Sequence, residues 1–252
     1  MEISHRRWLR CVALVLTAGF SSCTGTGSSV QPGPPALPNA PAQTASSHLL
    51  PASLSAINTT PGGVDGAPGQ FQPRRGDAKA GGHGSTVDKK VPCLPTMSNL
   101  YHVHAFVGII VNGTYVALPR AIGMVNPARA YNGYVNSATC FYEIHTHDST
   151  GIVHLEAAVN QPLSTAVFSL KNVLDVWGQK YGKTQFGRWT GPIHVFVGYA
   201  PLGHTTVSTY APYPGEKYWY LPLYSHEVVW IEIGNAYYDA SQLPPVTFYM
   251  EY

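Results

Sequence analysis

The residues of this 252-residue chain whose types and spacing could do chemistry are found among its 11 histidines. Five histidines lie either two residues apart or two residues before a carboxylate. The resulting pairs are His102 and His104, His145 and His147, and His154 with Glu156. Side chains two residues apart on a β-strand point to the same face, so each pair would act together if it lies on a strand. Neutral imidazoles with a carboxylate are typical ligands of divalent transition metals, so the spacing predicts a metal site.

Two of these pairs flank a predicted turn. Residues 140–147 and 152–157 have the composition of strands, and the connection Asp-Ser-Thr-Gly between them is typical of a β-hairpin. Symmetric pairing about this turn places His145 opposite His154, His147 opposite Ile152, and Glu143 opposite Glu156, all on one face. Like charges opposite each other on a sheet are destabilising, and a bound cation would reverse the sign of that interaction.

We therefore expect a mononuclear or dinuclear metal site built on His145, His147 and His154. The further candidate ligands are His102, His104 and Glu156. Copper or zinc is expected first and iron next, because all three accept nitrogen-rich ligand sets. If the site is catalytic, Glu143 and Glu156 are the candidates for moving protons. An isolated histidine is more often an ordinary core or surface side chain, which is our interpretation of His194 and His204.

The elements that must position these residues are predicted to be mostly strands. Residues 101–111 and 115–118 flank Asn-Gly, the strongest short hairpin signal. Further strands are expected at 192–199, 218–223, 227–233 and 246–252. Apolar residues of 169–178 recur with helical spacing, with Ser169 as the N-cap and Gly178 as the stop. The predicted fold is mainly β: a compact β-sandwich or small barrel with one short helix, preceded by a disordered tether.

Composition divides the chain into three parts. Residues 24–90 hold 9 Pro, 11 Gly and a single aromatic residue, Phe71, so they cannot bury enough apolar surface to offset the entropy of ordering. We expect a disordered linker over 23–90. All 16 Tyr lie beyond residue 100, which places the histidine-rich β domain in 91–252.

The N-terminus has the features of an export signal. A basic start is followed by an apolar run over 11–20 that is too short to span a bilayer, which predicts a signal peptide over 1–22. Small residues precede Cys23, which is typical of a bacterial lipoprotein whose cysteine carries the lipid. The alternative is ordinary cleavage and a soluble secreted product. Either way we expect a protein of the bacterial cell envelope or its surroundings that touches a membrane only through its N-terminal lipid.

The chain has four cysteines, and two of them, Cys93 and Cys140, belong to the predicted domain. Two cysteines in one domain of a protein that enters an oxidising compartment favour a disulfide. The alternative is that Cys140 is a thiolate ligand beside the histidines, as in blue-copper sites.

Charge and motifs exclude several classes of protein. The 15 Lys and Arg against 13 Asp and Glu give no single-sign field, which argues against a nucleic-acid partner. The sequence contains no C-x-x-C, G-x-S-x-G, H-E-x-x-H or P-loop motif. Nothing in the sequence indicates a protein partner.

Four blocks of the sequence resemble a known pattern when they are taken together. YHVHAFVGIIVNG, CFYEIHTHDSTGIVHLE, DVWG and PLYSH are similar, in that order, to blocks shared by a largely uncharacterised family of bacterial exported proteins. The resemblance implies that His226 joins the histidine set and supports His102 and His104. Phe106 stands where the family often has another histidine, and Glu143 stands where it favours tryptophan. The resemblance implies no activity.

Three function classes fit these observations. The first is an exported metalloenzyme whose histidines leave one coordination position open for water or dioxygen. The second is a copper or zinc buffer or carrier without turnover. The third is a ligand-binding module that uses its aromatic residues, with a structural metal.

Overall fold

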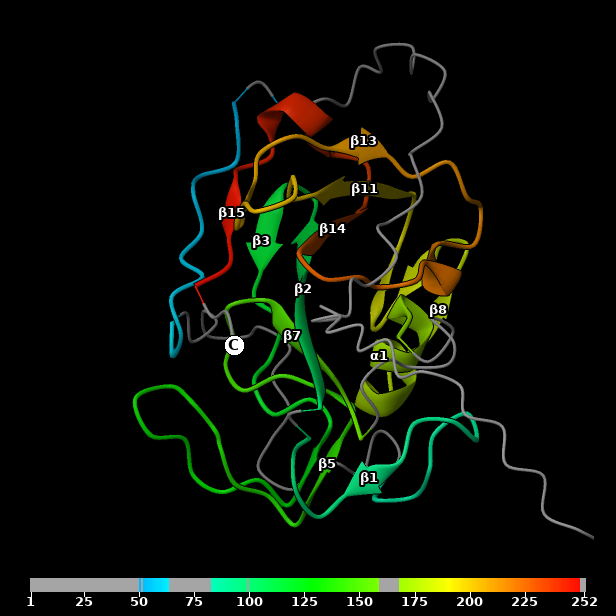
Figure 1. The fold of residues 1–252 in the computed structure, drawn as a ribbon. Helices are drawn as coiled ribbons and strands as arrows, with labels where there is room; N and C mark the ends of the chain where they lie inside the picture. The colour runs from blue at the N-terminus through cyan, green and yellow to red at the C-terminus, as the bar shows by residue number, and fades with distance from the viewer. Residues whose placement is uncertain (1–49, 51, 64–82, 99, 159–167, 250–252) are drawn as a thin grey trace, which may run out of the picture. The chain divides into compact units, whose positions relative to one another are not determined.

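A computed structural model describes residues 50, 52–63, 83–98, 100–158 and 168–249 of the chain (Figure 1). The predicted signal peptide and Cys23 lie outside these residues. The described part is mainly β with one α-helix, which confirms the predicted fold class. None of its helices is both long enough and apolar enough to cross a bilayer.

The largest sheet has seven strands and is open, so the fold is sandwich-like and not a closed barrel. Its order is β13-β11-β14-β2-β7-β6, and β3 also pairs with β2. The strands are β2 (Tyr101–Val111), β3 (Thr114–Val116), β6 (Ile144–His145), β7 (Ile152–Ala157), β11 (Ile193–Tyr199), β13 (Ala211–Pro212) and β14 (Glu227–Ile233). β14 and β2 are parallel, and the other pairs are antiparallel.

Three smaller sheets and two 3-10 helices complete the described part of the chain. One sheet contains β1 (Cys93–Leu94), β5 (Cys140–Tyr142) and β4 (Met124–Val125); another contains β8 (Tyr181–Gly182), β9 (Gln185–Phe186) and β10 (Trp189–Thr190). A third pairs β12 (Thr206–Val207) with β15 (Val246–Thr247). The 3-10 helices are η3 (Tyr218–Tyr220) and η4 (Ala240–Gln242).

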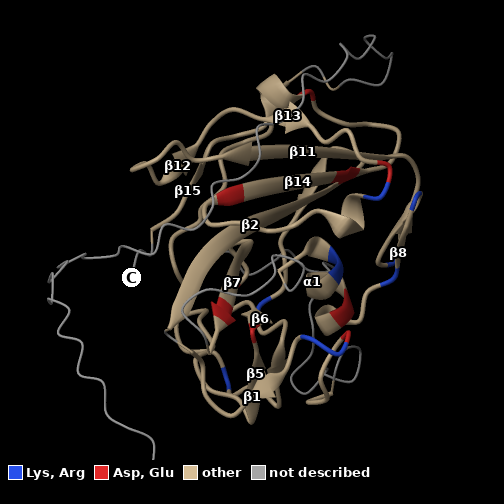
Figure 2. Cartoon of the chain, turned by 45° about the vertical axis from the view of Figure 1, so that its right-hand side comes forward, with Lys and Arg blue, Asp and Glu red and all other residues tan. Residues whose placement is uncertain are grey.

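The two faces of the main sheet have different cores because side chains alternate along each strand. Ala105 and Val107 of β2 belong to the larger core cluster, which includes the apolar side of α1 (Leu170–Trp177). Phe106 and Ile110 point the other way, into a second cluster around Trp230. Charged side chains are sparse on the sheet, and those of β7 and β14 are acidic (Figure 2). The histidines of β2 share the parity of Phe106 and continue that second face.

Several local predictions are confirmed. The hairpin β2–β3 turns at Asn112 and Gly113, which have the positive φ values (47° and 80°) that such a turn requires. α1 begins after Ser169, whose side chain accepts a hydrogen bond from the backbone N–H of Asn172, and ends at Gly178 with φ 75°.

Other local predictions are wrong. Residues 218–223 were expected to form a strand, but Tyr218–Tyr220 form η3, whose turn is closed by the Leu221 N–H donating to the Tyr218 carbonyl. The aromatic residues there pack on their neighbours, and the residues after them form only an isolated antiparallel bridge between Pro222 and Ser169. The expected strand 140–147 is interrupted at Glu143, because β5 pairs with β1 and β4 while β6 joins the main sheet.

Two pieces of the predicted linker, 52–63 and 83–90, are described and contact the domain. The Leu54 N–H donates to the Gln242 carbonyl, and buried Thr59 donates its hydroxyl to the Thr247 carbonyl at 2.6 Å. Leu54 and Ile57 pack against the cluster around Trp230. The composition of these pieces predicted no order, because it does not reveal backbone hydrogen bonds to a distant segment. Disorder in the rest of the linker stays a prediction.

Candidate metal centre

Three histidines form a row across three neighbouring strands. His104 of β2 is the register partner of His154 of β7, and His154 is in turn the partner of His145 of β6. The pairing of His145 with His154 is the one that the turn predicted, so this part of the hairpin register is confirmed. The β6–β7 ladder covers only Ile144 and His145, and beyond Ile144 the backbone N–H of Glu156 donates to the Glu143 carbonyl at 2.8 Å.

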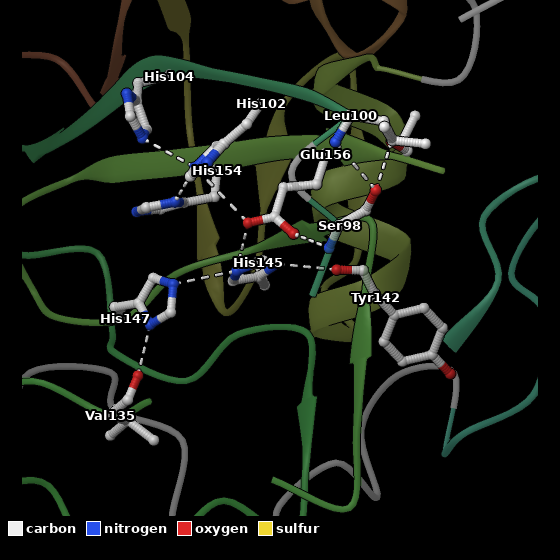
Figure 3. Close-up of polar contacts among 11 residues, drawn as sticks. Ser98, Leu100, His102, His104, Val135, Tyr142, His145, His147, His154 and Glu156 are labelled. Carbon is white, nitrogen blue, oxygen red and sulfur yellow. Dashed lines mark hydrogen bonds and ion pairs between the residues drawn. The ribbon is translucent and has the colours of Figure 1, made fainter. Parts of the chain in front are cut away.

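The ring nitrogens fall into two groups of three. The first contains His102, His104 and His154, and the second contains His145, His147 and His154. Within each group the potential ligand atoms all lie within 4.8 Å of one another, and His154 belongs to both (Figure 3). The five histidines of the three predicted pairs are therefore brought together.

Backbone carbonyls fix the orientation of the rings of His145 and His147. His145 Nδ1 lies 2.8 Å from the Tyr142 carbonyl oxygen, and His147 Nδ1 makes a short contact with that of Val135. A carbonyl oxygen only accepts hydrogen bonds, so each Nδ1 must carry the ring proton. In the neutral rings, the Nε2 atoms of His145 and His147 then carry a lone pair and no proton, and they lie 3.1 Å apart.

Burial keeps these rings neutral. His145 is fully buried, and loss of solvation lowers its pKa well below the ordinary value, with the neighbouring His147 acting in the same direction. Burial lowers the pKa of His147 to about 4, although the hydrogen bond that this ring donates to the Val135 carbonyl and the charge of Asp148 act in the opposite direction. The pKa of His154 is also well below its usual value because of burial. Neutral imidazoles are the form that binds a metal ion.

The other group is centred on the ring of His102. His102 Nε2 lies 2.9 Å from His154 Nδ1 and 3.1 Å from His104 Nε2. The rings of His102 and His104 meet edge to face, with centroids 4.8 Å apart. Burial lowers the pKa of His102, although this ring is more exposed than those of the other group.

Glu156 lies between the two groups (Figure 3). Its Oε1 is 3.6 Å from His102 Nε2 and 3.6 Å from His145 Nε2, while its Oε2 accepts the backbone N–H of Ser98 at 2.9 Å. Burial is the main reason that the pKa of Glu156 is raised to about 7, and nearby Glu143 adds to the effect. The Glu143 carboxylate accepts a hydrogen bond from the backbone of Ala158, beyond the end of β7.

A pocket opens beside the first group. It is narrow and partly open, with about 10 Å³ available to a water-sized molecule, and His104 and His154 form part of its wall. The other lining residues are Thr59, Pro61, Asp148, Thr150, Ile152, Phe248 and Tyr249. Asp148 also accepts the backbone N–H of Gly62 at 2.7 Å, so the described piece 52–63 is attached to this wall.

The remaining candidates lie elsewhere. His226 is in neither group: its backbone N–H donates to the His104 carbonyl, and its ring packs on Phe248. His194 stacks on Tyr237 with centroids 3.9 Å apart. Cys140 forms a disulfide with Cys93, with a Cα–Cα distance of 5.5 Å, so its sulfur is not the thiolate ligand of the alternative.

Sequence reasoning missed the groups that hold the ligands in place. The ring of Tyr134 stacks on His147 at 4.5 Å and 3°, and the Val135 carbonyl fixes the same ring. Ser98 holds Glu156 through its backbone. No local sequence pattern predicts these contacts, because they depend on how loops outside the histidine strands pack against them.

Comparison with family models, with curated proteins and with solved structures found no match for the chain. The function is therefore inferred from the geometry of the histidine groups. The resemblance to exported bacterial proteins stays a prediction.

Proposed function

We propose that this chain is an exported metal-binding protein that holds a resident transition-metal ion on His145, His147 and His154. One observation carries the proposal. The buried rings of His145 and His147 each donate their Nδ1 proton to a backbone carbonyl, so each Nε2 carries a lone pair, and these two Nε2 atoms lie 3.1 Å apart. Metal-binding histidines characteristically donate their other N–H to a carbonyl in this way.

The competing explanations of this contact are weaker. A hydrogen bond between the two Nε2 atoms needs a proton on one of them, and both ring protons are already committed to carbonyl oxygens. An extra proton would make a buried imidazolium, which desolvation disfavours. A divalent ion satisfies both lone pairs at once. Metal–nitrogen bonds of about 2.0–2.1 Å place neighbouring tetrahedral ligands about 3.3 Å apart, close to the separation found here.

The ligand set favours a metalloenzyme over a carrier. Three histidines leave a fourth position open, which is typical of catalytic and not of structural zinc sites. An ion there would activate water or polarise a substrate. Glu156, which faces a nitrogen of each group, is the side chain placed to move a proton. Because the ligands are buried, we expect slow exchange of the ion, which does not suit a buffer or carrier. We expect copper or zinc first and iron next.

Export is supported by the disulfide and by the N-terminal sequence. The Cys93–Cys140 bond suits an oxidising compartment. Together with the signal peptide expected over 1–22 and the lipid expected on Cys23, it supports a place in the bacterial cell envelope, in keeping with the resemblance of the four sequence blocks.

Elemental analysis tests the proposal. The protein is purified from its native compartment, beside the double variant His145→Ala/His147→Ala and the control His204→Ala, which changes an exposed histidine outside both groups. We expect the double variant to hold one ion per chain less than the control, with circular dichroism showing that both are folded. Equal metal in the two variants, or none in the native protein, would overturn the proposal.

A further inference from the structure

The two histidine groups are organised for two ions. We infer that a second divalent ion binds His102, His104 and His154, with His154 bridging the two ions and Glu156 facing both. This inference rests on the proposed function of the His145, His147 and His154 group. It adds a second site beside a narrow, partly open pocket, where a water molecule would reach the metal.

His102 contacts two other histidines through a single ring nitrogen. Its Nε2 lies close to two other ring nitrogens, those of His154 and His104, at 2.9 and 3.1 Å. A ring nitrogen carries either one N–H or one in-plane lone pair, so it can complete a hydrogen bond with only one of these neighbours. An ion bound by the three rings replaces both contacts with metal–nitrogen bonds.

The two groups have one histidine in common. The five histidines fall into two groups of three, and His154 is their common member. An imidazole has two ring nitrogens and can ligate one ion with each, provided that its N–H proton is released to solvent. Two ions would bring four positive charges into a largely buried site. The bridging imidazolate and Glu156, held by the Ser98 N–H with its free oxygen 3.6 Å from a nitrogen of each group, would offset part of that charge.

The surroundings give the two ions different access. His145 and His147 are buried and attached to backbone carbonyls. His104 and His154 line the narrow, partly open pocket, whose wall mixes apolar residues such as Phe248 with polar ones such as Thr150. The second ion would therefore be the one that meets water from this pocket.

Counting zinc tests the number of sites. The full chain, stripped of metal, is titrated with Zn²⁺ and the bound ions are counted in the wild type, His104→Ala, His147→Ala and the control His204→Ala. We expect two ions per chain in the wild type and control, and one in each of the other variants. Saturation of the wild type at one ion, or two ions in His104→Ala, would overturn the second site and leave the proposed function standing. A wild type that binds none would overturn both.

A measurement on the wild type alone tests the bridge without relying on a folded variant. Two Cu²⁺ ions joined through one imidazolate are magnetically coupled, so their combined EPR signal is weaker than that of two isolated ions. We expect the signal to rise up to one equivalent of Cu²⁺ and to fall as the second binds. A signal that doubles at two equivalents would show that His154 does not bridge the ions.

Discussion

The two histidine groups use the same residue type and share His154, yet the chain holds them differently. His145 and His147 are anchored through Nδ1 to backbone carbonyls and are almost fully buried. His102 and His104 lie at the end of β2, where His102 is partly exposed and His104 borders a pocket. Metal affinity grows when second contacts hold the ligands in place, and reactivity requires access, so the difference assigns retention to one group and exchange to the other.

The largest effect is expected from the histidine that the groups share. His154→Ala removes a ligand from both, so the metal-dependent part of the stability should disappear. For an ion at 1,000 times its Kd that part is about 4 kcal/mol. The measurement is the rise in unfolding midpoint on adding Zn²⁺. His194→Ala, which removes a histidine outside both groups, should keep the rise. A full rise in His154→Ala would contradict the sharing.

Acid should destabilise the metal-free protein through the enclosed group. His147 has a pKa of about 4 in the folded protein against 6.5 in the unfolded chain, so between these values the unfolded state binds more protons. The stability present above pH 6.5 should therefore fall by roughly 3 kcal/mol for this residue as the pH drops to 4. Urea unfolding of the apo protein at a series of pH values measures the loss. His147→Gln should show a smaller loss, and identical slopes would contradict the assignment.

The smallest effect is expected from the ring that covers the enclosed group. Tyr134 stacks on His147, so Tyr134→Ala should loosen that ligand by about 1 kcal/mol, or about fivefold in the rate at which a chelator removes the enclosed ion. Tyr131→Ala is the matched control, because Tyr131 belongs to the same turn but is 80% exposed. Equal release rates in both variants would show that the stack does not hold the ligand.

Local sequence patterns predicted part of the arrangement of the two histidine groups. The turn between 147 and 152 and the two-residue spacing predicted the pairing of His145 with His154, and capping residues predicted α1. The sequence could not show that β2 pairs with β7 so that His104 meets His154, because that register is set by long-range packing of the strands. For the same reason it could not show the Val135 carbonyl behind His147 or the attachment of 52–63 beside the pocket.

Resemblance and composition also had limits. His226 was expected among the ligands, but it belongs to neither histidine group. Its ring packs on Phe248, and its backbone, which has a positive φ of 54°, donates its N–H to the His104 carbonyl. Aromatic content at 218–223 indicated a strand, and packing produced a 3-10 turn.

X-ray absorption at the metal edge of the native protein tests the central claim most directly. We expect a first shell dominated by nitrogen at about 2.0–2.1 Å, with the outer-shell scattering of imidazole rings, that loses its imidazole contribution in His145→Ala/His147→Ala. A first shell of oxygen or sulfur without imidazole scattering would contradict a metal centre built on these histidines.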